Sequence, residues 1–74
     1  MNQQQACRKA IQLAGGPAAL AAKLKTITGK KITRNAISQW ERVPDRRVLE
    51  VETAIDRQIT RHELRPDLYP REGN

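Results

Sequence analysis

The sequence predicts an all-α fold, a compact bundle of about five short helices that forms one domain over residues 1–74. Three observations lead to this prediction. Apolar residues recur at spacings of three and four along several short stretches, and no stretch alternates apolar and polar residues as a strand would. Glycine and proline stand at the ends of those stretches. The chain has 74 residues, which is too few for a second core.

The first helix is expected over residues 3–14. One face of it carries small and aliphatic side chains at helical spacing: Ala6, Cys7, Ala10, Ile11 and Ala14. Gly15 and Gly16 follow, and they end the helix because glycine readily adopts the left-handed conformation of a helix C-terminus.

The second helix follows at once, since Pro17 suits the first position of a helix. It is alanine-rich, which favours helix, and is expected to run to Thr28 with Gly29 as its stop. Its inward stripe consists of aliphatic residues at i, i+4 and i+7: Leu20, Leu24 and Ile27. Lys30 and Lys31 then form a short basic loop.

A third helix is expected over residues 34–41, with Thr33 as its N-cap and Val43-Pro44 as the break after it. Its inward stripe is predicted to consist of Ala36, Ile37 and Trp40.

Two further helices are expected in the second half of the chain. One runs from Asp45 to about Ile55, with an acid at its start that suits the helix dipole. Its inward residues are Val48, Val51 and Ile55. Thr60 and Glu63 have the spacing of a capping box and begin a short helical turn, which Pro66 limits. The C-terminal segment, residues 60–74, is therefore expected to be extended or a short helical turn.

Composition excludes several classes of protein. No run approaches the roughly 18 apolar residues that span a bilayer, and the start Met-Asn-Gln-Gln-Gln lacks the apolar stretch of a signal peptide. The single cysteine, Cys7, cannot form an internal disulfide, and with His62 alone it cannot complete a metal site. The aromatics are only Trp40 and Tyr69, so the core is too thin for a buried catalytic cleft. We therefore expect a cytoplasmic, non-enzymatic protein with no cofactor, no metal and no membrane partner.

Positive charge is concentrated in one half of the chain. Residues 1–42 contain eight Lys and Arg and a single acid, Glu41, whereas residues 43–74 contain six Arg and seven acids. The first half therefore presents a cationic surface that attracts a polyanion such as nucleic acid. The alternative is a face that only aids solubility. The neutral half is available for self-association.

The outward side of the third helix carries the residue types that read a DNA major groove. With Ile37 inward and about 100° per residue, the outward residues are Arg34, Asn35, Ser38, Gln39 and Arg42. Asn and Gln bond adenine edges, Arg bonds guanine, and Ser serves either base. An ordinary solvated helix face more often mixes Glu and Lys at i, i+4. The alternative is that Asn35 and Gln39 are ordinary surface residues.

Two stretches resemble the helix-turn-helix of phage Cro repressors and of related YdaS-type bacterial regulators. They are residues 18–24, AALAAKL, and residues 32–40, ITRNAISQW, which Val43-Pro44 follows. The similarity continues through residues 48–52 and 60–69 and covers about residues 6–70. It implies a lambda-repressor-like DNA-binding domain whose helix-turn-helix, with an extended turn, spans about residues 17–42.

The resemblance also implies roles for individual residues. Arg34, Asn35, Ser38 and Gln39 occupy its base-reading positions. Its structural core corresponds to Leu20, Ala21, Leu24, Ile37 and Trp40. Of these, Ala21 is the small residue where the two helices touch, and Trp40 anchors the end of the recognition helix against the fourth helix.

The turn after Leu24 is about six residues longer than the family's tight turn, and Pro17 stands where many relatives have a polar, phosphate-binding residue. Our hypothesis is that the insertion lengthens the second helix and delivers Lys30 and Lys31 to the DNA backbone. The backbone amides of Ala18 and Ala19 are also expected to bind phosphate. The remaining candidates for phosphate contacts are Arg42, Arg8, Lys9, Arg46 and Arg47.

These observations predict a sequence-specific repressor of the phage Cro type, in a bacterium or a phage-infected bacterium. It is expected to bind a palindromic operator in double-stranded DNA as a homodimer, with half-sites about 10 bp apart. The dimer surface is expected on the fourth helix and residues 64–69. One alternative is an antitoxin-like protein-interaction module. The other is a charge-driven, non-specific nucleic-acid-binding protein, which the lack of aromatic stacking platforms disfavours.

Overall fold

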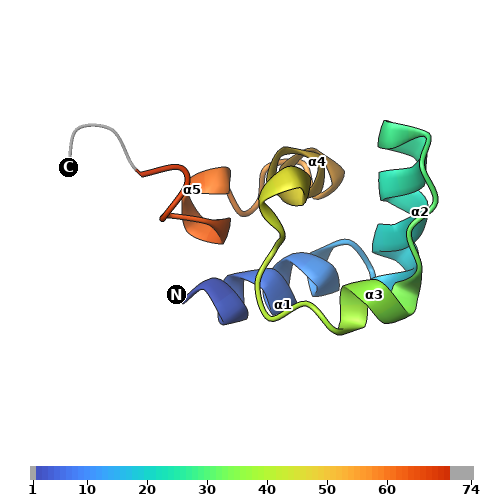
Figure 1. Cartoon of the computed structure of the whole chain (residues 1–74), viewed down its shortest axis with the longest axis horizontal. Helices are drawn as coiled ribbons and strands as arrows, with labels where there is room; N and C mark the ends of the chain where they lie inside the picture. The colour runs from blue at the N-terminus through green and yellow to red at the C-terminus, as the bar shows by residue number, and fades with distance from the viewer. Residues whose placement is uncertain (1, 71–74) are drawn as a thin grey trace.

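The structure is an all-helical bundle, as the sequence predicts (Figure 1). It is a computed structural model that describes residues 2–70. Its elements are α1 (Gln3–Leu13), α2 (Pro17–Thr28), α3 (Arg34–Ser38), the 3₁₀ helix η1 (Asp45–Arg47), α4 (Val48–Ala54) and α5 (Arg61–Leu64). Within residues 2–70 there is no strand, and no helix is long and apolar enough to cross a membrane. Residues 71–74 of the predicted C-terminal segment lie outside the described part of the chain.

The turn between α1 and α2 requires glycine. The Gly15 amide donates to the Gln12 carbonyl at 3.0 Å and the Gly16 amide to the Ile11 carbonyl at 2.9 Å, which is the Schellman pattern of a helix end. Gly15 has a φ of 103°, and a Cβ placed there would come within 3.2 Å of the Ala19 Cβ. This close approach sets the angle at which α2 leaves α1.

One hydrophobic core joins the helices. Its buried residues are Ala6, Cys7, Ala10, Ala14, Leu20, Leu24, Ile37, Val43, Val48, Val51, Ala54, Ile55, Ile59 and Leu64. Five partly buried side chains pack against it: Ile11, Ala21, Ile32, Trp40 and Tyr69. The inward stripes predicted for the first and fourth helices are therefore confirmed.

Two residues predicted to face inward are exposed instead. Ile27 is 43% exposed, because the last turn of α2 extends beyond α1 and α3 (Figure 1). Thr28 takes the half-buried position there, and its hydroxyl donates to the Leu24 carbonyl at 2.9 Å. Ala36 is exposed because α3 is too short to bury more than one residue, and Ile37 is that residue.

The third helix ends at Ser38, three residues earlier than predicted. The Trp40 amide donates to the Ile37 carbonyl at 3.1 Å, the i to i+3 spacing that tightens a helix end. Beyond Trp40 the chain is not helical until η1 begins. Arg42, which helical periodicity placed on the outward side of the helix, therefore lies in a loop, and other contacts set its direction.

The start of α5 is capped by a side chain from another helix. The predicted cap at Thr60 is wrong in its details, because the Thr60 hydroxyl is buried without a hydrogen-bond partner in the described residues. The Glu63 amide bonds the Thr60 backbone carbonyl at 3.0 Å. Glu52, on α4, accepts the Arg61 amide at 2.7 Å and the Arg61 Nη2 at 3.2 Å. A carboxylate suits the positive end of a helix, so Glu52 takes the place predicted for the hydroxyl.

Candidate nucleic-acid interface

A local cap and one buried side chain position α3. Thr33 is the N-cap, as predicted, and its Oγ1 accepts the Ala36 amide at 3.2 Å. Helix α3 packs against α2, and Ile37 is its one buried residue. On α2, the small residue expected at this contact, Ala21, lies half-buried against the core. The remaining sides of α3 face solvent.

The four predicted base-reading residues share the exposed surface of α3 and its C-cap. Arg34, Asn35, Ser38 and Gln39 are all exposed. Within residues 2–70 their side chains form no recorded hydrogen bond or ion pair. The helix contains no acidic residue. Amide, hydroxyl and guanidinium groups are therefore available on this surface for an external partner.

Arg42 lies apart from these residues, next to the first turn of α1. Its Nη1 donates to the Gln3 Oε1 at 3.4 Å, and the Gln3 Nε2 donates to the Asp67 Oδ1 at 3.0 Å. Gln3 and Arg42 line an open hollow at the surface together with Gln4 and Glu41. Three segments distant in sequence thus meet at Gln3.

The N-terminus of α2 exposes backbone amides. Pro17 is the first helical residue, and the N-cap Gly16 has no side chain with which to cap the helix. The Leu20 amide donates to the Gly16 carbonyl at 2.9 Å. The amides of Ala18 and Ala19 have no recorded acceptor in the described residues. They are free to bind an anion at the positive end of the helix.

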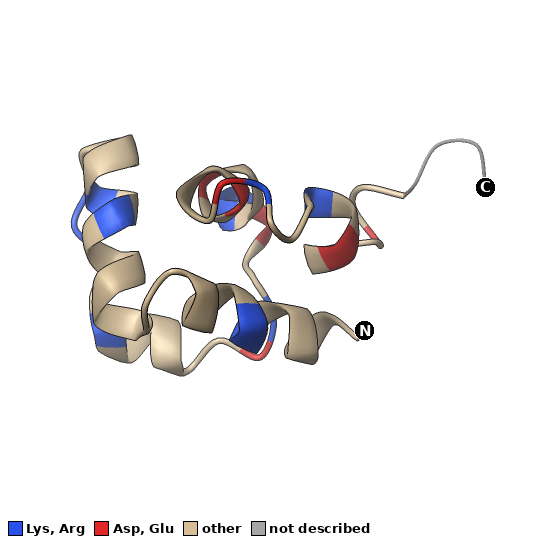
Figure 2. Cartoon of the chain, turned by 180° about the vertical axis from the view of Figure 1, so that it is seen from behind, with Lys and Arg blue, Asp and Glu red and all other residues tan. Residues whose placement is uncertain are grey.

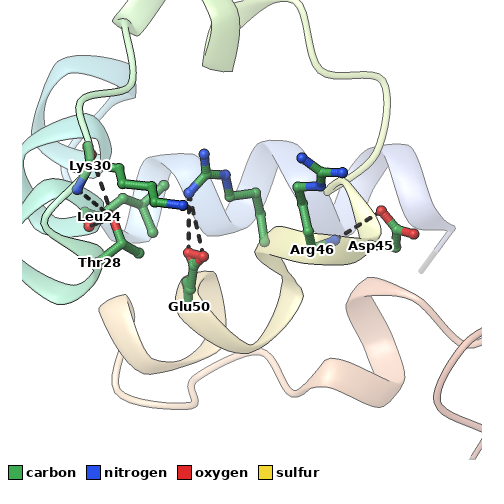
Figure 3. Close-up of polar contacts among 7 residues, drawn as sticks. Leu24, Thr28, Lys30, Asp45, Arg46 and Glu50 are labelled. Carbon is green, nitrogen blue, oxygen red and sulfur yellow. Dashed lines mark hydrogen bonds and ion pairs between the residues drawn. The ribbon is translucent and has the colours of Figure 1, made fainter.

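The basic loop after α2 lies beside the start of α4. Thr28 Oγ1 accepts the Lys30 amide at 3.1 Å, which holds the loop against the end of α2. Lys30 lines a hollow (Figure 3) whose other residues are Thr28, Arg46, Arg47 and Glu50. Arg47 pairs with Glu50 at 3.2 Å. Lys30 and Arg46, a further predicted phosphate contact, thus line the same hollow.

The cations of residues 2–42 are exposed, and none forms a recorded ion pair with another described residue. They are Arg8, Lys9, Lys23, Lys25, Lys30, Lys31, Arg34 and Arg42. The three ion pairs recorded in the described chain all lie within residues 43–70. Figure 2 shows Lys and Arg on α2 and no Asp or Glu there. Within the described part of the chain, no recorded ion pair neutralises the positive charges of the first half.

Cys7, His62 and Trp40 are all at least partly buried. Cys7 is buried, and burial raises the pKa of its thiol to about 11, which keeps the thiol protonated. His62 is half-buried, and its Nδ1 donates to the Tyr69 carbonyl at 2.8 Å. Trp40 is half-buried against the core. No group of three His, Cys, Asp or Glu residues within residues 2–70 is placed to hold a metal ion.

Sequence reasoning missed two buried charged residues. Glu52 and Arg65 are 4% and 6% exposed. The Arg65 Nη1 donates to the Val43 carbonyl at 2.9 Å, and its Nε and Nη2 donate to the two oxygens of Asp67 at 3.0 and 2.8 Å. The one available signal was the spacing of Arg65 and Asp67 on either side of Pro66. Nothing in that spacing indicates Val43.

The family model described as "Bacterial toxin YdaS" matches residues 7–72. No match to the chain is found among curated proteins or among solved structures. The matched region contains α2, α3 and all the predicted base-reading and phosphate-binding residues. Since it covers most of the chain and agrees with the observed helices, the chain belongs to the YdaS family of small Cro/C1-like helix-turn-helix proteins.

Proposed function

We propose that the chain is a DNA-binding transcriptional repressor that inserts the exposed side of α3 into the major groove. The observation that carries the proposal is the surface formed by Arg34, Asn35, Ser38 and Gln39, which is exposed and has no partner in the described chain. Their donors and acceptors match the edges of adenine and guanine. Membership of a helix-turn-helix family supports the same docking. This function requires no catalytic group, cofactor or metal.

The phosphates on either side of the groove are bound, in this proposal, by groups that flank α3. Ala18 and Ala19 offer amides from the start of α2. Lys30 and Lys31 come from the loop before α3, and Arg42 comes from the loop after it. Contacts from three separate segments fix the register of a helix on the duplex, although they carry no sequence information.

The unit that binds DNA is a homodimer on an inverted repeat. A single domain of this size reads about four or five base pairs, which is too few to specify one site in a genome. Two copies with half-sites about 10 bp apart double the sequence that is read. Leu49 on α4 and Leu68 are 46% and 43% exposed and form part of the proposed contact between copies. We place this dimer in the cytoplasm, at the nucleoid.

A titration at two salt concentrations tests the proposal. The protein is added to a palindromic duplex selected from a random library, to random duplex and to single-stranded RNA. We expect a preference above about 10³ for the selected duplex over random duplex. Equal affinity for all three nucleic acids contradicts base reading and indicates a charge-driven binder.

The basic loop has its own test. If about five phosphates per subunit are neutralised, the slope of log K against log salt is near −4 to −5 per subunit. The double substitution Lys30→Ala, Lys31→Ala is expected to weaken binding to any duplex and to make that slope shallower by about 2. Unchanged affinity shows that the loop points away from the DNA.

A second candidate function is a toxin–antitoxin-like interaction with another polypeptide. The description of the family as a bacterial toxin favours it, and Leu49 and Leu68 offer an exposed apolar surface in the neutral half. Induced expression of the wild type and of Gln39→Ala in bacterial cells separates the two. If growth inhibition occurs and persists in Gln39→Ala, it acts through a surface other than α3. If it disappears, it depends on DNA reading.

A further inference from the structure

A closed ring of polar contacts holds the loop that follows α3. Arg65 donates to the Val43 carbonyl at 2.9 Å and to both oxygens of Asp67. Asp67 Oδ1 also accepts from Gln3 at 3.0 Å, and Gln3 accepts from Arg42 at 3.4 Å. Arg42 precedes Val43 in the chain, so the contacts return to the loop where they began.

Arg65 is the rigid part of this ring. It is buried, and its guanidinium meets Asp67 as a two-point fork, the arrangement that orients both partners most strongly. The hydrogen bonds from Arg65 lower the pKa of the Asp67 carboxyl to about 2. Asp67 is therefore charged at any pH at which the protein would meet DNA.

The loop has few other polar restraints, although the Val43 side chain is buried in the core. The one hydrogen bond recorded to the backbone of residues 41–43 is the bond from Arg65 to the Val43 carbonyl. The next backbone contact is the Arg47 amide with the Pro44 carbonyl at 2.8 Å, at the start of η1. Since α3 ends at Ser38, helical geometry does not place Arg42 either. Besides the burial of Val43, the C-terminal segment and α1 supply the polar contacts that place Arg42.

We propose that Gln3, Asp67 and Arg65 are positioning residues of the DNA interface, which hold Arg42 where its guanidinium can contact a phosphate. This inference rests on the proposed function and adds to the interface a part that lies outside the helix-turn-helix. Arg42 is exposed, and its Nε and Nη2 have no recorded partner in the described chain. Those groups remain available to a phosphate while Nη1 is held by Gln3.

Because Arg42 is already ordered in the free protein, less conformational entropy is lost when it binds a phosphate. A long side chain that is already oriented adds affinity because ordering it costs free energy. We expect the benefit to be about three- to tenfold in affinity for any duplex, regardless of its sequence.

A double-mutant cycle measures it. The affinity of the wild type, Gln3→Ala, Arg42→Ala and the double variant is determined for a random-sequence duplex of 20 base pairs. In the presence of Arg42, Gln3→Ala is expected to weaken binding about three- to tenfold. In the Arg42→Ala background, it is expected to have no effect. Asp67→Asn disturbs the fork one contact further away and also removes a negative charge in both backgrounds, so its coupling with Arg42→Ala is the quantity expected to match that of Gln3→Ala.

Salt dependence separates positioning from a loss of structure. Gln3→Ala removes no charge, so a salt slope that becomes shallower by up to about 1 shows that Arg42 has lost its phosphate. Gln4→Ala is the matched control, because Gln4 is the exposed neighbour of Gln3 and its side chain forms no recorded hydrogen bond. Thermal unfolding of each variant checks that it is folded at the temperature of the titration.

Three results overturn the inference. Equal losses with Gln3→Ala in both backgrounds, or no loss in either, show that Gln3 does not act through Arg42. Tighter binding by Gln3→Ala shows that the contact holds Arg42 away from DNA. If the wild type binds no duplex at all, the proposed function fails together with the inference. The first two results overturn the inference alone, because the wild type then still binds duplex.

Discussion

The two halves of the described chain use basic residues in opposite ways. In residues 2–42, all eight Lys and Arg side chains are exposed, and none forms a recorded ion pair with another described residue. In residues 43–70, Arg47, Arg61 and Arg65 pair with Glu50, Glu52 and Asp67. The first half leaves its charge exposed to solvent, while the second half uses much of its charge in ion pairs within the fold.

The difference has a physical basis in burial. A buried arginine is stable only when its donors are satisfied, so Arg65 comes with Asp67 and the Val43 carbonyl. An exposed lysine keeps its hydration and needs no partner. The field of unpaired cations then extends into solvent, where it attracts a polyanion. The predictions below test this division from the largest expected effect to the smallest.

Ile37→Ala is expected to have the largest effect. Ile37 is the one buried residue of α3, so truncating it costs about 2–5 kcal/mol of unfolding free energy. A domain of 74 residues has roughly 4–11 kcal/mol in total. Denaturant titration followed by circular dichroism measures the loss. Ser38→Ala, on the exposed side of the same helix, is the control, and a similar loss there would mean that burial does not hold α3 in place.

Glu52→Ala tests the structural use of charge in the second half. It removes the carboxylate that caps α5 and leaves the Arg61 amide without its partner, at a cost of about 2–3 kcal/mol. Glu50→Ala is the matched control, since it breaks only the more exposed pair with Arg47 and is expected to cost less than about 1 kcal/mol. Thermal unfolding compares the two, and equal losses contradict a special role for Glu52.

Gln39→Ala tests the opposite use of polar groups in the first half. Because Gln39 is exposed and unengaged, the unfolding free energy is expected to stay the same. Affinity for the selected duplex is expected to fall by roughly 1–3 kcal/mol, with little change for random duplex. Gln12→Ala, an exposed glutamine on α1, is the control for the titration. An equal loss on both duplexes shows that Gln39 does not read a base.

The smallest expected effect is the pH dependence contributed by Asp67. Its pKa is lowered from 3.8 to about 2 in the folded protein, so its ionisation stabilises the fold above about pH 4. This stability is lost as the pH falls through 2, and Asp67→Asn is expected to flatten the acid limb of a plot of melting temperature against pH. If the acid limbs of the two proteins coincide, the pairing with Arg65 contributes nothing measurable.

Most of the helices could be predicted because their signals are local. Gly29 ends α2 in the left-handed conformation that glycine allows, and Thr33 caps α3 with its hydroxyl, both as expected. The predictions at Ile27 and Ala36 were wrong because periodicity identifies a face but not how far neighbouring elements cover it. The helix begins after Thr60 as predicted, but the predicted hydroxyl cap was wrong, and tertiary packing instead brings the Glu52 carboxylate to the first amide of α5.

The sequence by itself determined the helical class, the exposed polar surface at Arg34, Asn35, Ser38 and Gln39, and the charge difference between the two halves. Spacing and composition are enough for these features. Only the tertiary structure decided which groups meet across the chain. The Arg61 amide finds Glu52 nine residues away, Arg65 finds Val43 across 22 residues, and Gln3 finds Asp67 across 64. Such partners are chosen by packing, because the folded core decides which distant acceptor lies near each donor, and a buried donor such as Arg65 must then be paired.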